Sequence, residues 1–474
     1  MSFSVEDQLY GNFKSIYNSS PQFIKSVIGH LYGLVPARLR YGKTYSYYLS
    51  LLEKSQWWSD AEIEDYQWRE TERLLHHAYQ NVPYYKSLFD EHALSLKDIQ
   101  NFYDFKKIPY LTKEIVRNNL SNLLAKNYSK SNAILVTTGG SSGAPLSLYY
   151  EKGVSRSMEN AFIMTQWKRY GYSSGDRTVV LRGDVIKNTN DKAPSYFDPI
   201  KNSLILSSYH MIDDNLRHYI TKINSFKPKY LHVYPSSLII LAQYMKRNSV
   251  EPFPGLKGIL ASSETIHDWQ LELFQEVFEC RVYHWYGLSE LAALAGVCEV
   301  SDNYHVFPEY SYVEFIKNEE EVINNGNDNV FEIVGTSFCN DITPLIRYRT
   351  MDYAIPEKNK CECGRNHKLI KKVLGRKQDF FIDKSGSIIT FIYADVPLWP
   401  MKHKIMAYQY IQNVAGKVIL KIEPKEKFTK SDIELIMSGF KNIYTRFELK
   451  IDFVEKIHRT QSGKFLYFKQ NIFS

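Results

Sequence analysis

The spacing of hydrophobic residues changes twice along the chain and divides it into three parts. In residues 1–130 apolar side chains recur at helical intervals, as in 22–31, and Pro36 ends that helix. A second helical stretch covers residues 60–90 and is interrupted at Val82-Pro83. We therefore expect the first part to be mostly helical.

Short apolar runs alternate with helical stretches from residue 131 to residue 375, which is typical of an α/β fold. The strand candidates are 133–136, 178–181 and 230–233. The polar run 324–329 lies between two alternating segments and predicts a hairpin turn rather than a functional loop.

Residues 376–474 have the pattern of a smaller α+β unit. Strands are expected at 418–422 and 449–453, with a helix over 431–444 between them. The three parts together predict an α/β protein whose large N-terminal domain begins with a helical segment and is followed by a small α+β C-terminal domain.

Composition narrows the class of protein. The 474 residues are 44% hydrophobic and 23% charged, as in an ordinary globular protein. The net charge of +7, from 59 basic and 52 acidic residues, is spread along the chain without a basic stripe, so no nucleic-acid partner is expected. The aromatic content of 15% suits aromatic-lined pockets, although drift in composition explains it equally well.

The sequence also bears on location. Its N-terminus lacks the pattern of a signal peptide, and no run of 18 apolar residues is present to span a membrane. Five cysteines, an odd number, then indicate reduced thiols in the cytoplasm. The apolar face of 22–31, followed by Arg38, Arg40 and Lys43, could lie on a membrane surface; packing against the parent domain is the preferred interpretation.

Six short motifs, each weak alone, occur in a fixed order. They are Thr-Gly-Gly-Ser-Ser-Gly-Ala-Pro (138–145), Ala-Ser-Ser-Glu (261–264), Tyr-Gly-Leu-Ser-Glu (286–290), Arg-Tyr-Arg-Thr-Met-Asp (347–352), Gly-Arg-Lys-Gln-Asp (375–379) and Arg-Thr-Gln-Ser-Gly-Lys (459–464). In the first motif, glycines allow backbone amides to turn inward and hydroxyls add donors, which suits phosphate oxygens. The glycines are Gly139, Gly140 and Gly143, and the hydroxyls belong to Thr138, Ser141 and Ser142. A flexible linker is the alternative.

Three charged residues complete the chemistry that an enzyme needs to activate a carboxylic acid with ATP. Glu290 can hold the Mg²⁺ that bridges ATP phosphates, although a glutamate at the start of a surface helix would look the same. Asp352, after the strand-like run 345–349, can accept the ribose hydroxyls; otherwise it is a turn aspartate. Lys464, ten residues from the C-terminus, can stabilise the charge that builds as pyrophosphate leaves, although alone it would be taken for a solvated lysine.

In this order the motifs resemble those of the adenylate-forming superfamily, which contains acyl-CoA synthetases, nonribosomal adenylation domains and luciferases. Residues 344–352, 361–365 and 375–376 are similar to the phenylacetate–coenzyme A ligase family. The segment from 55–58 through 77–85 resembles the branch named for capsular polysaccharide biosynthesis (CapK-like). The resemblance covers nearly the whole chain.

The resemblance implies a large domain, with 1–130 as its helical part and 131–375 as its nucleotide- and acyl-binding core, and a mobile C-terminal lid at 376–474. It places the phosphates on 138–143, magnesium on Glu290, ribose on Asp352, further nucleotide contact on Arg376, and the adenylation step on Lys464. Other nucleotide-binding residues by position are Ser263, Glu264, Tyr286, Gly287 and Ser289. The acyl pocket would be lined by Tyr234, Ser262, Tyr283 and Trp285, together with the rest of the 262–264 turn.

Three residues depart from the family's pattern. Ala144 stands where many relatives carry lysine, and Met351 where many carry glycine or arginine. Gln378 replaces the first of two hinge aspartates and leaves only Asp379. Because the family's small domain rotates between two half-reactions, the altered hinge bears on the second step more than on adenylation.

Four zinc-competent residues come from two segments of the chain. They are Cys298, His305, Cys361 and Cys363. The Cys-x-Cys spacing is tighter than usual, and Gly364 beside it would permit a sharp turn. Similarity to relatives with a Cys-x-Cys-Gly-Arg segment implies a structural zinc; the alternative is buried small thiols with a surface histidine. Cys280 and Cys339 are expected in the core.

The sequence thus predicts an AMP-forming acid–thiol ligase that uses MgATP. The acceptor would be coenzyme A or the phosphopantetheine thiol of an acyl carrier protein, and the resemblance suggests a role in surface polysaccharide biosynthesis. Transfer to an amine or a protein cysteine, and a nucleotide-binding regulator without turnover, remain alternatives. A P-loop phosphotransferase is disfavoured because the Gly-Lys-Ser/Thr ending is missing. Aromatics near 283–286 favour a planar or medium-length acid, and a homodimer is compatible with the sequence.

Overall fold

The N-terminal part of the protein is helical. The computed structural model describes residues 37–138, 146–182, 194–266, 268–317, 330–376, 380–384, 388–390, 396–458 and 466–472, with 27, 28, 31 and 35. Its first elements are α4 (Ala37–Ser55), α5 (Asp60–Asn81), α6 (Pro83–Glu91), η1 (Leu96–Asp98), α7 (Phe102–Phe105), α8 (Lys113–Asn118) and η2 (Lys130–Asn132). The helical stretch predicted at 60–90 is confirmed as α5 and α6, with the break at Val82. Most of the helix expected at 22–31, and the turn at 324–329, lie outside the described residues.

A sheet of twelve strands forms the centre of the large domain. Its order is β11-β12-β13-β14-β10-β9-β8-β7-β6-β3-β5-β4. One half comprises β3 (Thr178–Leu181), β4 (Ser195–Asp198), β5 (Ser203–Leu206), β6 (Tyr230–Val233), β7 (Gly258–Ser262) and β8 (Arg281–Gly287). The other comprises β9 (Leu294–Val297), β10 (Tyr304–Val306), β11 (Ser311–Ile316), β12 (Phe331–Ser337), β13 (Tyr348–Glu357) and β14 (Leu369–Arg376). Strands β5, β3, β6, β7 and β8 run parallel, and pairing becomes antiparallel at β8–β9.

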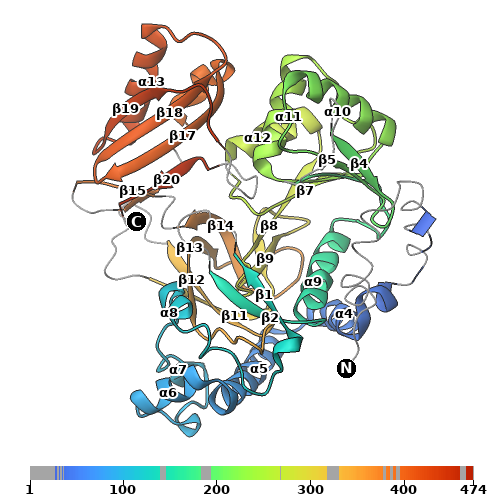
Figure 1. Ribbon diagram of the computed structural model, residues 1–474, viewed down its shortest axis with the longest axis vertical. Helices are drawn as coiled ribbons and strands as arrows, with labels where there is room; N and C mark the ends of the chain where they lie inside the picture. Colours follow the sequence, from blue (N-terminus) through green and yellow to red (C-terminus); the bar gives the residue numbers. More distant parts are fainter. Residues whose placement is uncertain are drawn as a thin grey trace.

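Helices cover both faces of the parallel half. On one face, α10 (Asp213–Phe226), α11 (Pro235–Arg247) and α12 (Asp268–Phe278) bury an apolar core that includes Val179, Leu231 and Ile259 (Figure 1). On the other lies α9 (Ser155–Arg169). The N-terminal helices pack a second core against the antiparallel half. This layering confirms the predicted α/β fold.

A separate two-stranded hairpin precedes α9. It pairs β1 (Ala133–Thr137) with β2 (Ser147–Glu151), and Thr138 closes its open end through two hydrogen bonds to Leu146. The strands predicted at 133–136, 178–181 and 230–233 are all confirmed.

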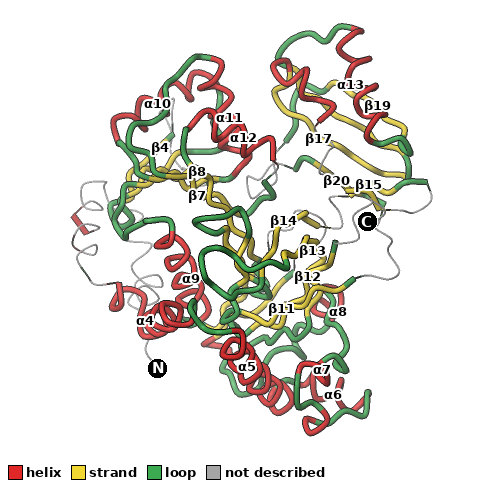
Figure 2. Tube along the Cα trace, turned by 180° about the vertical axis from the view of Figure 1, so that it is seen from behind, coloured by secondary structure: helices red, strands yellow, loops and turns green. Residues whose placement is uncertain are grey.

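The C-terminal part forms a smaller α+β unit. Its elements are β15 (Phe380–Ile382), β16 (Ile388–Thr390), η5 (Val396–Lys404), β17 (Ile405–Val414), β18 (Lys417–Pro424), α13 (Lys430–Ile443), β19 (Glu448–Phe453) and β20 (Phe468–Gln470). Thr429 begins α13 with a capping box that includes Asp432. The predicted strands and helix are confirmed, and the unit lies beside the lobe formed by α10, α11 and α12 (Figure 2). In the described part of the chain, no helix has the length and hydropathy to cross a membrane.

Candidate active site

The segment that follows β8 lies where the central sheet changes from parallel to antiparallel pairing. The Tyr150 hydroxyl, from the β1–β2 hairpin, donates to the Ser289 carbonyl. The Tyr348 hydroxyl donates to Glu290 Oε1 over 3.3 Å. Glu290 is only 6% exposed, so it is not the surface glutamate considered as the alternative. This turn therefore joins a buried carboxylate to the hairpin.

A second buried carboxylate, Asp352, lies beside β8. The Tyr286 hydroxyl donates to Asp352 Oδ2 over 2.9 Å, and Asp352 is 4% exposed. The sequence placed Asp352 after a strand, whereas it lies inside β13, because the strand begins at Tyr348 and runs to Glu357. Arg376 is its backbone partner across the β13–β14 pair.

The predicted phosphate loop connects the two strands of the hairpin. Of its residues only Thr138 is described, and its backbone N–H donates to the Leu146 carbonyl over 2.8 Å. The other expected contacts lie outside the described residues: Gly139, Gly140, Ser141, Ser142, Gly143, the side chain of Arg376, the hinge residues Gln378 and Asp379, and Lys464. The hairpin that carries the loop is joined to the Glu290 turn through Tyr150 and Ser289, three residue pairs away from the loop itself.

Glu264 has a structural place in this region. Its carboxylate accepts hydrogen bonds from the backbone N–H and the hydroxyl of Ser236, over 2.8 and 2.9 Å, at the start of α11. Ser263 has a left-handed backbone, with φ of 71°. The 262–264 turn is therefore held over the first turn of α11.

A cavity of about 710 Å³ opens between α9 and the parallel strands. All four predicted acyl-pocket residues line it, namely Tyr234, Ser262, Tyr283 and Trp285. Ser263, Gly287 and Ser289 line it as well, so the cavity reaches the turn that carries Glu290. The Tyr283 ring stacks on that of Tyr170, with centroids 3.8 Å apart, which makes this wall rigid.

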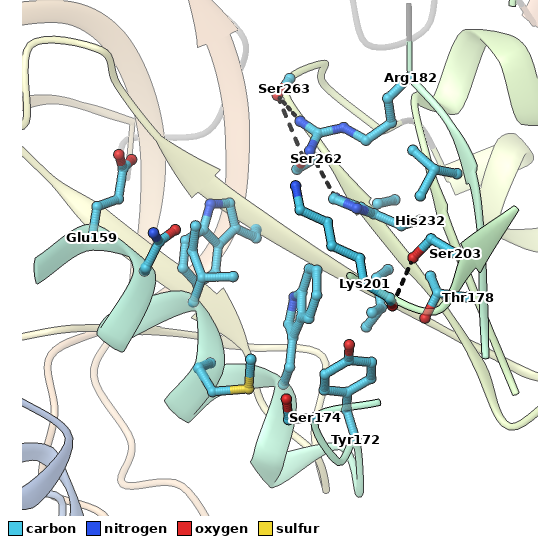
Figure 3. Close-up of a pocket in the computed structure, with 18 of the residues that line it drawn as sticks. Glu159, Tyr172, Ser174, Thr178, Arg182, Lys201, Ser203, His232, Ser262 and Ser263 are labelled. Carbon is cyan, nitrogen blue, oxygen red and sulfur yellow. Dashed lines mark hydrogen bonds between the residues drawn. The ribbon is translucent and has the colours of Figure 1, made fainter. Parts of the chain in front are cut away.

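Polar residues outside the predicted acyl pocket also line the cavity. Arg182, His232 and Lys201 lie on the sheet side, and Glu159 comes from α9 (Figure 3); Asp198 of β4 also lines the cavity. The sequence of the parallel strands does indicate this polar lining. Thr178 begins β3 and Arg182 follows it, Ser203 begins β5, and His232 interrupts β6, although strands covered on both faces are usually apolar throughout.

The four zinc-competent residues come together at the end of β9. Their ligand atoms all lie within 4.8 Å of one another. Cys298 Sγ is 3.6 Å from Cys361 Sγ, and Cys363 Sγ is 3.5 Å from His305 Nε2. A tetrahedral zinc with bonds of about 2.0–2.3 Å requires ligand separations of roughly 3.5–3.8 Å, so the arrangement fits the metal.

Burial shifts the pKa values of two of these ligands. It raises the pKa of the Cys298 thiol to about 12 and lowers the pKa of His305 to about 3. The histidine is therefore neutral and able to ligate at neutral pH. All five cysteines are free thiols, and Cys280 and Cys339 are buried in apolar surroundings, as predicted.

Comparison with known sequences identifies relatives of the whole chain. Residues 381–471 match the family model of the CapK C-terminal domain. The chain is 24% identical over 463 residues to Protein CapK of Staphylococcus aureus, covering 96% of this chain and 99% of that protein. It is 22% identical over 385 residues to the phenylacetate-coenzyme A ligase of Thermus thermophilus, covering 77% and 82%.

Solved structures share the fold. A 2-hydroxyisobutyryl-CoA ligase in the postadenylation state, in complex with R3-HIB-AMP, matches with a TM-score of 0.68 at 16% identity, covering 88% of this chain and 93% of that one. The same ligase in the thioesterification state matches with a TM-score of 0.57, covering 89% and 92%. The comparisons together confirm the predicted resemblance to the phenylacetate–coenzyme A ligases and to CapK, and the solved structures share the predicted fold.

Proposed function

We propose that this relative of the phenylacetate–coenzyme A ligases activates a carboxylic acid in the cavity beside β8 and passes the acyl group to a thiol. One observation carries the proposal: among the described residues, the segment 286–290 contacts both buried carboxylates, the hairpin and the cavity. The Tyr286 hydroxyl donates a hydrogen bond to Asp352, and Gly287 and Ser289 line the cavity. The Ser289 carbonyl accepts a hydrogen bond from Tyr150 of the β1–β2 hairpin, and Glu290 accepts one from Tyr348.

In the first half-reaction an oxygen of the acid's carboxylate attacks the α-phosphorus of ATP. The new P–O bond forms as the bond to pyrophosphate breaks, which gives an acyl-adenylate. Asp352 would accept the ribose hydroxyls, and the amides and hydroxyls of 138–143 would hold the phosphates. Arg376 would add a nucleotide contact, and Lys464 would stabilise the charge that develops on the leaving group.

Magnesium suits Glu290. The carboxylate is buried, and its Oε1 is oriented by Tyr348, which fits the preference of Mg²⁺ for fixed oxygen ligands. A bound Mg²⁺ would neutralise charge on the phosphates. The role of this chain is to hold the carboxylate at the point where the hairpin and the cavity meet.

In the second half-reaction a thiolate attacks the carbonyl carbon of the adenylate, and AMP leaves. Coenzyme A is the proposed acceptor, because the phenylacetate-coenzyme A ligases among the relatives carry that activity in their name. A carrier-protein phosphopantetheine is the second thiol to test. The similarity to Protein CapK extends the proposal to a cytoplasmic acylation step in surface polysaccharide biosynthesis.

The experiment is ATP–pyrophosphate exchange over a panel of acids, followed by product analysis with coenzyme A. Glu290→Gln and Asp352→Asn should each lower exchange by about 10²-fold or more, because the first weakens the proposed Mg²⁺ ligand and the second the proposed ribose contact. Asp302→Asn is the matched control, since its side chain is fully exposed outside the cavity. Exchange by Glu290→Gln equal to that of the control would refute the assignment.

We further propose that Cys298, His305, Cys361 and Cys363 bind one structural zinc. Four protein ligands leave no open position for substrate, so the metal would stabilise the fold rather than react. Elemental analysis should give one zinc per chain, and Cys361→Ser should lose it. Zinc content unchanged in Cys361→Ser, or no zinc in the wild-type protein, would refute the site.

A further inference from the structure

The wall of the acyl cavity is polar because of strand alternation. Along β3, Val179 and Leu181 enter the apolar core under α10–α12, whereas Thr178, Val180 and Arg182 line the cavity. The same alternation turns other side chains of the parallel strands toward the cavity, namely Ser203, Ile205, His232 and Tyr234. A cavity meant only for an apolar acid would not need an arginine and a histidine on the buried face of a sheet.

Arg182 directly follows the C-terminal end of β3 and is held there in a defined orientation. Its Nη1 lies 2.7 Å from His232 Nε2, and its Nη2 donates to Ser263 Oγ over 2.9 Å. Because a guanidinium can only donate, Nε2 is the acceptor and His232 carries its hydrogen on Nδ1. The guanidinium also lies over the Tyr234 ring, 5.1 Å from the centroid, so residues at the ends of β6 and β7 fix it.

A second cation points into the same space. Lys201, from the turn between β4 and β5, extends through the cavity with its ammonium group on the side of Ser262 and His232 (Figure 3). Burial, and then the charges of Arg182 and Lys201, hold the pKa of His232 well below its usual range. His232 is therefore neutral at physiological pH and supports Arg182 as a hydrogen-bond acceptor.

The charge of the lining favours an anion. Among the described lining residues three are cationic, Arg40, Arg182 and Lys201, and two are acidic, Glu159 and Asp198. The Asp198 carboxylate already accepts from the backbone N–H groups of Ile200 and Lys201. Glu159 lies on the α9 wall, away from Arg182, and burial raises the pKa of its carboxyl. Arg182 and Lys201 therefore line the cavity together, on the side away from Glu159.

We propose that the acid activated here carries a second anionic group, and that Arg182 and Lys201 bind it while the first carboxylate reacts. This inference rests on the proposed adenylation, because it assigns the substrate class of the same cavity. His232 and Ser263 are positioning residues that aim the guanidinium. The recognition chemistry is charge-assisted hydrogen bonding to a carboxylate, sulfonate or phosphate.

The test compares acids that differ only in the second charge. Adipate, glutarate and succinate are each paired with the monocarboxylate of equal chain length, and 4-carboxyphenylacetate is paired with phenylacetate. In wild-type protein, kcat/KM for pyrophosphate release should favour the dianion by about 10- to 100-fold for at least one pair. Sulfonate and phosphonate analogues of that acid then distinguish the kinds of anion.

Variants locate the preference. Arg182→Gln and Lys201→Met should each reduce the ratio of dianion to monoanion by about tenfold or more, and Arg182→Lys should retain part of it. Arg177→Gln is the matched control, because Arg177 precedes the same strand and donates to the Phe226 carbonyl outside the cavity. Thermal denaturation confirms that each variant is folded. It also measures binding without catalysis. In the absence of ATP, the preferred dianion should raise the denaturation midpoint of the wild-type protein but not that of Arg182→Gln.

The outcomes separate this inference from the proposed function. Efficient turnover of monocarboxylates, with ratios unchanged in Arg182→Gln, would overturn the inference and leave adenylation standing. An Arg182→Gln defect that is equal for both members of each pair and falls on the KM for ATP would overturn it too, since Arg182 would then belong to the nucleotide site. AMP from no acid would refute the function, and the denaturation midpoints with the dianions would then decide the anion site alone.

Discussion

Two tyrosine hydroxyls hold the two carboxylates that are proposed to receive MgATP. Tyr286, in β8, orients Asp352 through one hydrogen bond, and Tyr348, at the start of β13, orients Glu290 through another. A carboxylate that is held in place before the nucleotide arrives loses less side-chain entropy on binding.

Tyr286→Phe tests this positioning. Without the Tyr286 hydroxyl, Asp352 loses one hydrogen bond, which contributes about 1 kcal/mol. The KM for ATP and the Kd for AMP should therefore rise about fivefold, with kcat within twofold. Steady-state kinetics and calorimetric titration with AMP provide the two readouts. Tyr103→Phe, on a ring that is 80% exposed, is the control. A fall in kcat with an unchanged KM for ATP would contradict the assignment.

His284 gives the fold a dependence on pH. Burial lowers the pKa of His284 to about 4, and the Tyr304 hydroxyl contacts its Nδ1. Between pH 6.5 and pH 4 the unfolded chain therefore binds a proton that the folded chain does not, so stability falls as the pH decreases through this range. The loss from this group is at most about 3 kcal/mol, the free energy equivalent to the difference between the folded and unfolded pKa values.

Urea unfolding at pH 7 and pH 4.5 measures this effect. His284→Gln, which keeps an acceptor for Tyr304 and cannot titrate, should lose less stability on acidification than the wild-type protein. Equal losses in the two proteins would show that His284 does not titrate differently on folding.

Single residues differ in how well the sequence reveals them. Glu290 and Asp352 could be identified because each stands in a motif with a fixed spacing to glycine, tyrosine and arginine. Arg182 and His232 follow or interrupt short apolar strands and have no motif around them. Their function arises from the pairing of β3, β6 and β7, which places side chains 50 and 81 positions apart in contact.

At the scale of elements, periodicity predicted the helices over 60–90 and the strands at 178–181, 230–233, 418–422 and 449–453. It did not single out α4, whose Gly42 has φ of 83° and interrupts the helical spacing. It placed Asp352 after a strand, because the polar Arg349 and Asp352 mask the strand in which both lie. Arg349 pairs there with the buried Glu332, a contact that only the folded sheet reveals.

Close packing of two elements fixes the position of the Glu290 turn. Gly335 in β12 lies against the backbone that follows Glu290, and a Cβ atom there would be 1.9 Å from the Ala292 carbonyl oxygen. Gly335→Ala should therefore destabilise the protein by about 3 kcal/mol and displace the turn, with loss of pyrophosphate exchange.

Gly255→Ala is the matched control for this change. A Cβ there meets nothing within 4 Å, so only its φ of +79° is unfavourable, at about 1 kcal/mol. Urea midpoints and exchange rates measured on both variants give the comparison. Gly335→Ala as stable and active as Gly255→Ala would contradict the packing argument.

At the scale of the whole molecule, the order of strands could not be predicted from the sequence. Neighbours in the twelve-stranded sheet include β10 and β14, which are separated by more than sixty residues, and local patterns carry no information on such pairing. The small C-terminal unit could be predicted, because its strands and helix are short-range and regular. Its described contacts with the large domain include Lys425 Nζ to Gln243 Oε1, over 3.4 Å, and Tyr467 against the α10–α12 core.

This contact allows a test of domain rotation. A short bismaleimide that links Gln243→Cys to Lys425→Cys should retain ATP–pyrophosphate exchange and abolish acyl transfer to coenzyme A, because transfer requires the lid to turn. Each single-cysteine variant treated in the same way is the control, since native thiols also react. Acyl transfer at the wild-type rate in the linked protein would rule out the rotation.

The central claim is that an acyl-adenylate forms, and transfer of an oxygen atom tests it most directly. The preferred acid is labelled with ¹⁸O in its carboxylate and incubated with ATP, Mg²⁺ and coenzyme A, and the nucleotide products are analysed by mass spectrometry. We expect AMP that carries one ¹⁸O atom, because the attacking carboxylate oxygen leaves with the phosphorus when the thiol takes the acyl group. Label in inorganic phosphate, with ADP as the nucleotide product, would contradict it.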